Sequence, residues 1–197
     1  MTNIPIFPLG TVLFPYARLP LQIFEPRYVD LVSHCLKTDS GFGVVWLRQG
    51  SELVTKQPEL DPRLAEIGTY AKIVDWHSLP NGHLGITIEG QQLFSIKASQ
   101  QQANKLHRAD IEWLAAQPVI SLPDHVGDLT GLLHQLTQHP HVAALNINPD
   151  IRDVDTLGCV LAQLLPIDEA VKYALLSAVD PMTRLEQLMD FLDEMGA

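Results

Sequence analysis

The chain of 197 residues is long enough to bury a substantial core, either as one large domain or as two intimate subdomains. Its 46% of hydrophobic residues is typical of a globular protein, and no apolar run approaches the roughly 18 residues that a membrane span needs. The net charge of −10 disfavours nucleic-acid binding, because Lys and Arg supply most of the affinity for phosphate. Because the N-terminus also has no basic, signal-like region, we expect a cytoplasmic protein with no nucleic-acid or membrane partner.

Residues 4–28 combine short apolar runs with frequent prolines. Such runs, punctuated by Pro and Gly, are typical of edge strands joined by tight turns; the strand residues expected here are Ile4, Ile6, Val12 and Phe14. Leu19, Leu21 and Ile23 then alternate with polar or proline residues, which predicts a strand with one apolar face. Pro26 suits the first position of a helix, and the apolar spacing after it predicts a helix that ends near Lys37.

The middle of the chain has the two-residue period of β-strands. A buried strand is predicted at 42–47, a polar surface loop at 49–63, and a hairpin between 67–79 and 84–88, because Asn81-Gly82 accepts the positive φ angles of a tight turn. Two further strands are expected at 91–99 and 107–114. From Pro123 onward the period changes to that of helices, and we expect Asp155, Asp168 and Asp180 to begin three of them.

Strands followed by helices predict an α+β protein, with a β-rich subdomain at 1–117 and an α-helical subdomain at 118–197. The junction is expected within 114–123, without a Gly/Ser linker. Cys35 and Cys159 both fall on apolar helix faces, so we interpret them as buried thiols of a reducing compartment.

Three segments resemble the Lon substrate-binding domain. They are IPIFPLGTVLFPYARLPLQIFEPRY at the start, EIGTYAKIVDWHSLPNGHLGITIEGQQLFSIKA in the middle and QLLPIDEAVKYALLSAVDPMTRLEQLMDFL near the end. One family feature is missing, because Gln91, Gln92 and Leu93 stand before Phe94 where an arginine usually precedes the Phe. The resemblance implies a curled, largely antiparallel sheet of the PUA-like type packed against a helical bundle.

The resemblance also implies a non-catalytic, peptidase S16-like module that binds unfolded or partner polypeptides. Aromatic side chains suit loose recognition of peptides, although each of them is also a candidate core residue; the candidates for contact are Phe14, Tyr16, Trp46, Trp76 and His77. The IFEPRY motif is interpreted as structural, with Glu25 and Arg27 paired at the helix start and Phe24 beneath the helix, and a direct binding role is the alternative; its residues are Phe24, Glu25, Pro26, Arg27 and Tyr28.

No catalytic motif is found in the sequence. It contains no phosphate-binding G-x-x-x-x-G-K-[ST] loop and no dinucleotide fingerprint, and His134, His139 and His141 lack the regular spacing of a zinc site. We therefore expect neither an enzyme nor a bound metal or cofactor. The alternative is a small-ligand binder or an uncharacterised enzyme that uses a cleft between the two subdomains. The identity of a client, the recruitment of a separate protease and the oligomeric state stay open.

Overall fold

The structure is a computed structural model that describes residues 2–48, 64–123, 126–148, 151–178 and 180–194. The predicted loop at 49–63 lies outside the described residues. The chain forms two compact units: a β unit of Met1–Leu13 and Arg18–Ala115, and a helical unit of Phe14–Ala17 and Ala116–Ala197. Apart from one helix within the β unit, the strands precede the helices along the chain, and the prediction of an α+β fold is confirmed.

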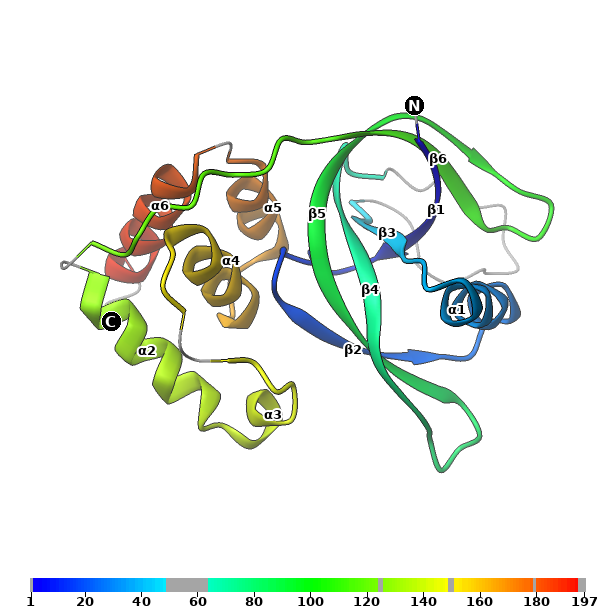
Figure 1. Ribbon diagram of the computed structural model, residues 1–197, viewed down its shortest axis with the longest axis horizontal. Coiled ribbons are helices and arrows are strands. Elements are labelled where there is room, and N and C mark those ends of the chain that lie inside the picture. Colours follow the sequence, from blue (N-terminus) through cyan, green and yellow to red (C-terminus); the bar gives the residue numbers. More distant parts are fainter. Residues whose placement is uncertain (1, 49–63, 124–125, 149–150, 179, 195–197) are drawn as a thin grey trace. The chain divides into compact units, whose positions relative to one another are not determined.

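The β unit is a six-stranded, strongly curled sheet (Figure 1). Its elements are β1 (Thr2–Leu9), β2 (Arg18–Ile23), α1 (Pro26–Thr38), β3 (Phe42–Trp46), β4 (Ile67–Ser78), β5 (Leu84–Gln101) and β6 (His107–Trp113). The strand order is β2-β5-β4-β3-β1-β6, and β5 also pairs with β6, so the sheet closes on itself. Strands β1 and β3 pair in parallel and the other strand pairs are antiparallel, so the sheet is largely antiparallel, as predicted.

The β4–β5 hairpin agrees with its prediction at the turn and differs beyond it. Gly82 has a φ of 81°, which is the positive value that the predicted Asn-Gly turn requires. The two strands expected at 84–88 and 91–99 are instead one strand of 18 residues, because register shifts in its pairing let it bend and continue. Val12 and Phe14, expected in a strand, lie outside β1 and β2.

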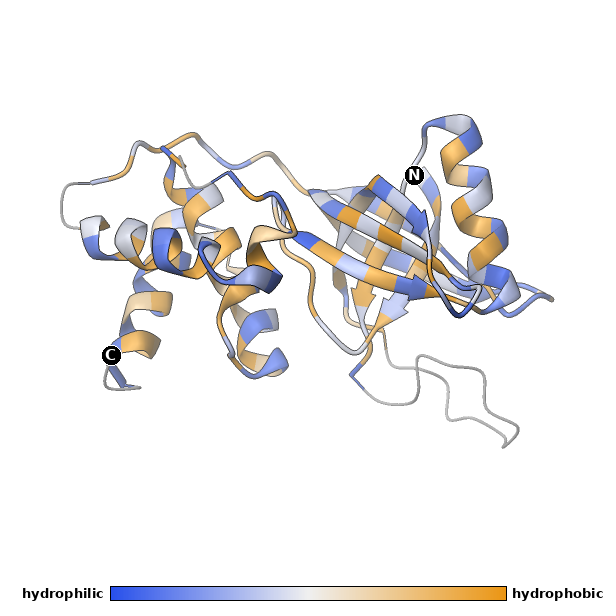
Figure 2. Cartoon of the chain, turned by 90° about the horizontal axis from the view of Figure 1, so that it is seen from below, coloured by the Kyte–Doolittle hydropathy of each residue, from blue (hydrophilic) through white to orange (hydrophobic). Residues whose placement is uncertain are grey.

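Helix α1 covers one opening of the curled sheet with its apolar face. Its buried residues join a core with strands β1, β2, β3, β4 and β5; they include Tyr28, Leu31, Val32 and Cys35. Burial raises the pKa of the Cys35 thiol, which fits the predicted inert thiol. Figure 2 shows apolar and polar residues alternating along α1, as expected of a helix with one buried side. Leu93, at the place of the missing family arginine, is itself buried.

The helical unit contains α2 (Gly127–Thr137), α3 (Pro140–Ala143), α4 (Val154–Leu164), α5 (Glu169–Ser177) and α6 (Pro181–Glu194). Asp168 and Asp180 accept hydrogen bonds from backbone N–H groups at the starts of α5 and α6, as predicted. The prediction for α4 was wrong by two residues, since Asp153 accepts from the N–H of Thr156. None of the helices in the described ranges is long and apolar enough to cross a membrane.

Asp155 does not cap the helix but is the partner of a buried arginine. Arg184 of α6 is 1% exposed and donates to the Asp155 carboxylate, and its other nitrogens donate to the carbonyls of Leu175 and Ala178. The Cys159 thiol lies beside the same guanidinium, 3.4 Å from Nη1. This network connects α4, α5 and α6 through one side chain.

Candidate functional site

The IFEPRY motif places successive side chains in opposite environments. Ile23, the last residue of β2, is buried, and Phe24 after it is 48% exposed. The expectation that Phe24 lies beneath α1 was therefore wrong, since Tyr28 fills that position by stacking on Phe7 with ring centroids 3.9 Å apart. Pro26 begins the helix as predicted. Phe24 thus lies at the surface between the end of β2 and the start of α1.

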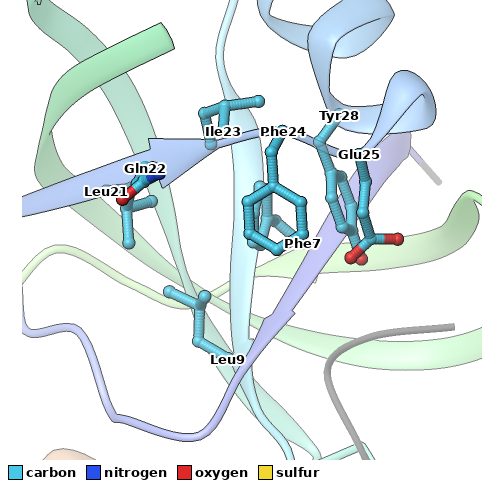
Figure 3. A pocket seen from close by; sticks show the side chains of 8 residues that line it. All are labelled: Phe7, Leu9, Leu21, Gln22, Ile23, Phe24, Glu25 and Tyr28. Carbon is cyan, nitrogen blue, oxygen red and sulfur yellow. The ribbon is translucent and has the colours of Figure 1, made fainter. Parts of the chain in front are cut away.

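A small apolar pocket lies beside this motif, between strands β1 and β2. We name it the β1–β2 pocket; its apolar lining is Phe7, Leu9, Leu21, Ile23, Phe24 and Tyr28. Gln22 and Glu25 complete the wall, and the cavity volume is about 120 Å³. Figure 3 shows the Phe24, Glu25 and Tyr28 side chains extending in the same direction beside Phe7. Because Phe24 is half exposed while Phe7 and Ile23 are buried, Phe24 forms the rim and the others form the floor.

Glu25 is the charged residue of the pocket wall, and it is held by Arg27. Oε2 of Glu25 lies 2.9 Å from Nη2 of Arg27, which confirms the predicted pair. The guanidinium also donates from Nη1 to the carbonyl of Lys105 at 2.6 Å and lies 4.5 Å above the Tyr28 ring. Oε1 of Glu25 is shielded from solvent and has no hydrogen-bond partner among the described residues.

Trp76 of β4 shares a sheet face with the pocket. Leu21 lies opposite Ile86 of β5, and Ile86 lies opposite Trp76, so the three side chains form a row on one face. Neighbouring strands are about 4.8 Å apart, so Trp76 is about 10 Å from the Leu21 wall. Its side chain is 58% exposed, whereas Ile86 between them is buried. Trp76 is thus an exposed aromatic residue two strands from Leu21, whereas Phe24 lines the pocket together with Leu21.

Phe24 is supported from the side by His83 of the hairpin. The two rings stack with centroids 5.4 Å apart, and the His83 ring also contacts the amide of Gln22. These contacts hold an exposed aromatic ring in place without burying it. Residues from the end of β2 and the tip of the β4–β5 hairpin therefore form one surface.

The other residues predicted for contact do not join this surface. Phe14 is fully buried and belongs to the helical unit, where its backbone N–H donates to Oε1 of Gln163. His77 lies opposite Gly85 and packs over it on the other sheet face, where a Cβ at Gly85 would be 2.7 Å from the ring. Trp46 is partly buried on β3, next to Leu9 in the sheet and roughly 30 Å of strand away from Trp76.

Tyr16 also belongs to the helical unit. Its backbone has a φ of 65°, which is uncommon for a bulky residue. Partial burial and the negative charge of Asp155, to which the hydroxyl donates, raise the pKa of Tyr16 to about 12. Tyr16 is 46% exposed, so the ring is at a surface even though its hydroxyl is engaged.

A second cavity of the β unit, of about 410 Å³, is more polar and lies beside α1, β1 and β6. Its arginines are engaged with protein groups: Arg27 with the Lys105 carbonyl, and Arg108 with the side chain and carbonyl of Asn3. Within the described residues no group of three or more His, Cys, Asp or Glu side chains is placed to hold a metal ion. The β1–β2 pocket is therefore the stronger candidate for a functional site.

Comparison with known proteins identifies the class of this fold. The family model of the ATP-dependent protease La (LON) substrate-binding domain matches residues 3–194, and the chain belongs to this family. The family resemblance read from the three sequence segments is thereby confirmed.

Individual relatives are similar to this chain over nearly its whole length. The Lon protease of Cytophaga hutchinsonii is 29% identical over 95% of this chain, and that of Vibrio parahaemolyticus is 24% identical over 95%. The chain spans about a quarter of the length of these relatives. Among solved structures, the Lon N-terminal domain protein from Xanthomonas campestris has a TM-score of 0.74 at 31% identity, covering 96% of this chain and 98% of that one. The N-terminal domain of Lon protease from the Mycobacterium avium complex has a TM-score of 0.60 at 18% identity, covering 96% and 97%.

Proposed function

We propose that this protein is a non-catalytic module that binds apolar segments of unfolded or partner polypeptides through the β1–β2 pocket and Trp76. The observation that carries the proposal is the exposure of Phe24 at the pocket and of Trp76 two strands away from Leu21 in the sheet. Membership of the Lon substrate-binding family supports the same class of ligand. We also propose a cytoplasmic location, because free, buried thiols such as those of Cys35 and Cys159 suit a reducing compartment.

The physical basis of this binding is apolar burial. Large aromatic side chains offer much contact area at a small cost in conformational entropy, which suits recognition of many different sequences. Because apolar burial does not depend on charge attraction, added salt should leave the affinity largely unchanged. A binder driven by the net charge of −10 would instead select basic peptides and release them at high ionic strength.

The test is a fluorescence or calorimetric titration with an unfolded model protein at low and high salt. Trp76→Ala and Phe24→Ala should each weaken binding by about tenfold, as expected of aromatic anchors. Val119→Ala is the matched control, because Val119 is an exposed apolar residue of the helical unit. It should bind like the wild type.

Two outcomes would overturn the proposal. One is binding that is confined to basic peptides and abolished by salt. The other is full affinity in both aromatic variants while circular dichroism shows them folded.

A further inference from the structure

We propose that the polar cavity beside α1, β1 and β6 binds a small zwitterion with an apolar side chain, the chemistry of a free aliphatic amino acid. The carboxylate of this ligand lies at Arg108 and its ammonium group at Asp30, and both residues line the cavity. The site shares no residue with the β1–β2 pocket, so it does not depend on the proposed binding of polypeptides.

The cavity wall carries two opposite charges that are not paired. Asp30 belongs to α1 and Arg108 to β6. Neither side chain forms an ion pair with any of the described residues, and they do not pair with each other. Binding sites arrange their charges to complement those of the ligand. Two opposite charges that line one cavity and stay apart therefore match a ligand that carries both signs.

Arg108 is held in place without being neutralised. Its Nε donates to Oδ1 of Asn3 at 2.6 Å, and its Nη2 donates to the Asn3 carbonyl at 3.1 Å. Both acceptors are neutral, so they orient the guanidinium and leave its charge uncompensated. The Asp110 carboxylate accepts from Nδ2 of Asn3 instead of from Arg108. A carboxylate is the natural partner of a fixed guanidinium, because bonds between charged groups are the stronger ones.

The other ionisable groups of the wall favour a zwitterion over an anion. Arg27 is balanced by Glu25 at 2.9 Å, and its Nη1 donates to the Lys105 carbonyl. The Tyr70 hydroxyl accepts from the N–H of Gly41 at 2.6 Å. The fixed charges that remain in the wall are the two named above, and they sum to zero.

The floor of the cavity is apolar. Ile4, Leu31 and Leu106 line it, and all three are buried. The cavity volume of about 410 Å³ falls within the range of roughly 300–1,000 Å³ that is usual for small-molecule sites. The ligand should therefore combine its two charges with an aliphatic side chain that covers this floor.

The experiment titrates the wild-type protein with four small molecules, and binding is followed by chemical-shift changes in the protein. L-leucine has all three features of the ligand, leucinamide lacks the carboxylate, N-acetyl-leucine lacks the ammonium group, and glycine lacks the apolar side chain. Leucine should bind most tightly. Each of the other three should bind at least about tenfold more weakly, because one charged hydrogen bond or one apolar contact is lost.

Protein variants connect each feature of the ligand to one side chain. Arg108→Gln should remove the difference between leucine and leucinamide, and Asp30→Asn should remove the difference between leucine and N-acetyl-leucine. Lys37→Gln and Glu66→Gln are the matched controls, because both side chains are exposed and lie outside the cavity wall. Both controls should keep the full order of affinities. If Arg108→Gln does not fold, the four-ligand series and Asp30→Asn decide the question.

Three results would overturn the inference. They are the absence of a saturable response to leucine, equal affinities for the four compounds, and an unchanged preference for leucine over both derivatives in the folded variants. The proposed function is tested separately, since binding of unfolded protein is expected to depend on Phe24 and Trp76, which do not line this cavity.

Discussion

Two phenylalanines that the sequence places in similar surroundings should respond very differently to truncation. Phe14 and Phe24 both follow short apolar runs, but Phe14 is fully buried and Phe24 is 48% exposed. Replacing a buried Phe by Ala costs about 3–5 kcal/mol, so Phe14→Ala should lower the free energy of unfolding by that amount. Full burial of such a side chain is worth about 1.5–3 kcal/mol, so the half-buried ring of Phe24 accounts for only about 1 kcal/mol.

Thermal unfolding followed by circular dichroism measures the difference. For a chain of this length, 1 kcal/mol shifts Tm by about 2–4 °C, so Phe14→Ala should melt roughly 6–20 °C earlier and Phe24→Ala only about 2–4 °C earlier. The prediction depends on the rank order of the two losses in Tm rather than on their absolute size. A larger loss for Phe24→Ala than for Phe14→Ala would refute both the burial of Phe14 and the assignment of Phe24 to the rim.

Three further outcomes are expected. Arg184→Met should cost about 3–5 kcal/mol in a urea titration, because it leaves the Asp155 carboxylate buried without its cation; a loss below about 1 kcal/mol would contradict the network. Tyr16 has a folded-state pKa raised from 10.0 to about 12, so its contribution to stability is complete below pH 10 and is lost as pH rises from 10 to 12. Tyr16→Phe should flatten this alkaline loss, and an unchanged pH profile would contradict it. The purified 197-residue chain should show neither ATP hydrolysis nor ATP-dependent casein degradation, since its sequence carries no phosphate-binding loop; ATP-stimulated degradation by a clean preparation would refute this.

Most elements of the fold could be predicted because their signals are local. Pro26 at a helix start, the Asn81-Gly82 turn and the capping residues Asp168 and Asp180 each act within a few residues of themselves. The Asp155 prediction failed for the opposite reason. Asp153 and Asp155 are equally plausible caps in sequence, and only the position of Arg184, 29 residues away, shows that Asp155 is a partner in a buried ion pair.

The candidate site was harder to predict because it depends on which strands are neighbours. The apolar alternation of Leu19, Leu21 and Ile23 identified one face of β2. It could not show that Leu21 faces the same side as Trp76, because that relation runs through the pairing of both strands with β5. His77, adjacent to Trp76 in sequence, is on the opposite face for the same reason. Aromatic character alone therefore gave no information on the residues that share a sheet face with Trp76.

The segment 14–17 shows why a boundary drawn once along the sequence cannot describe this protein. A boundary at 117/118 assigns Phe14 to the β-rich part, yet its ring is buried and its N–H is bonded to Gln163 within the helical unit. The chain leaves β1, contributes this turn to the helical unit, and returns as β2, whose end carries Phe24 and Glu25. A fragment that ends at Ala115 would therefore keep every strand but leave Phe14 without the partner of its N–H.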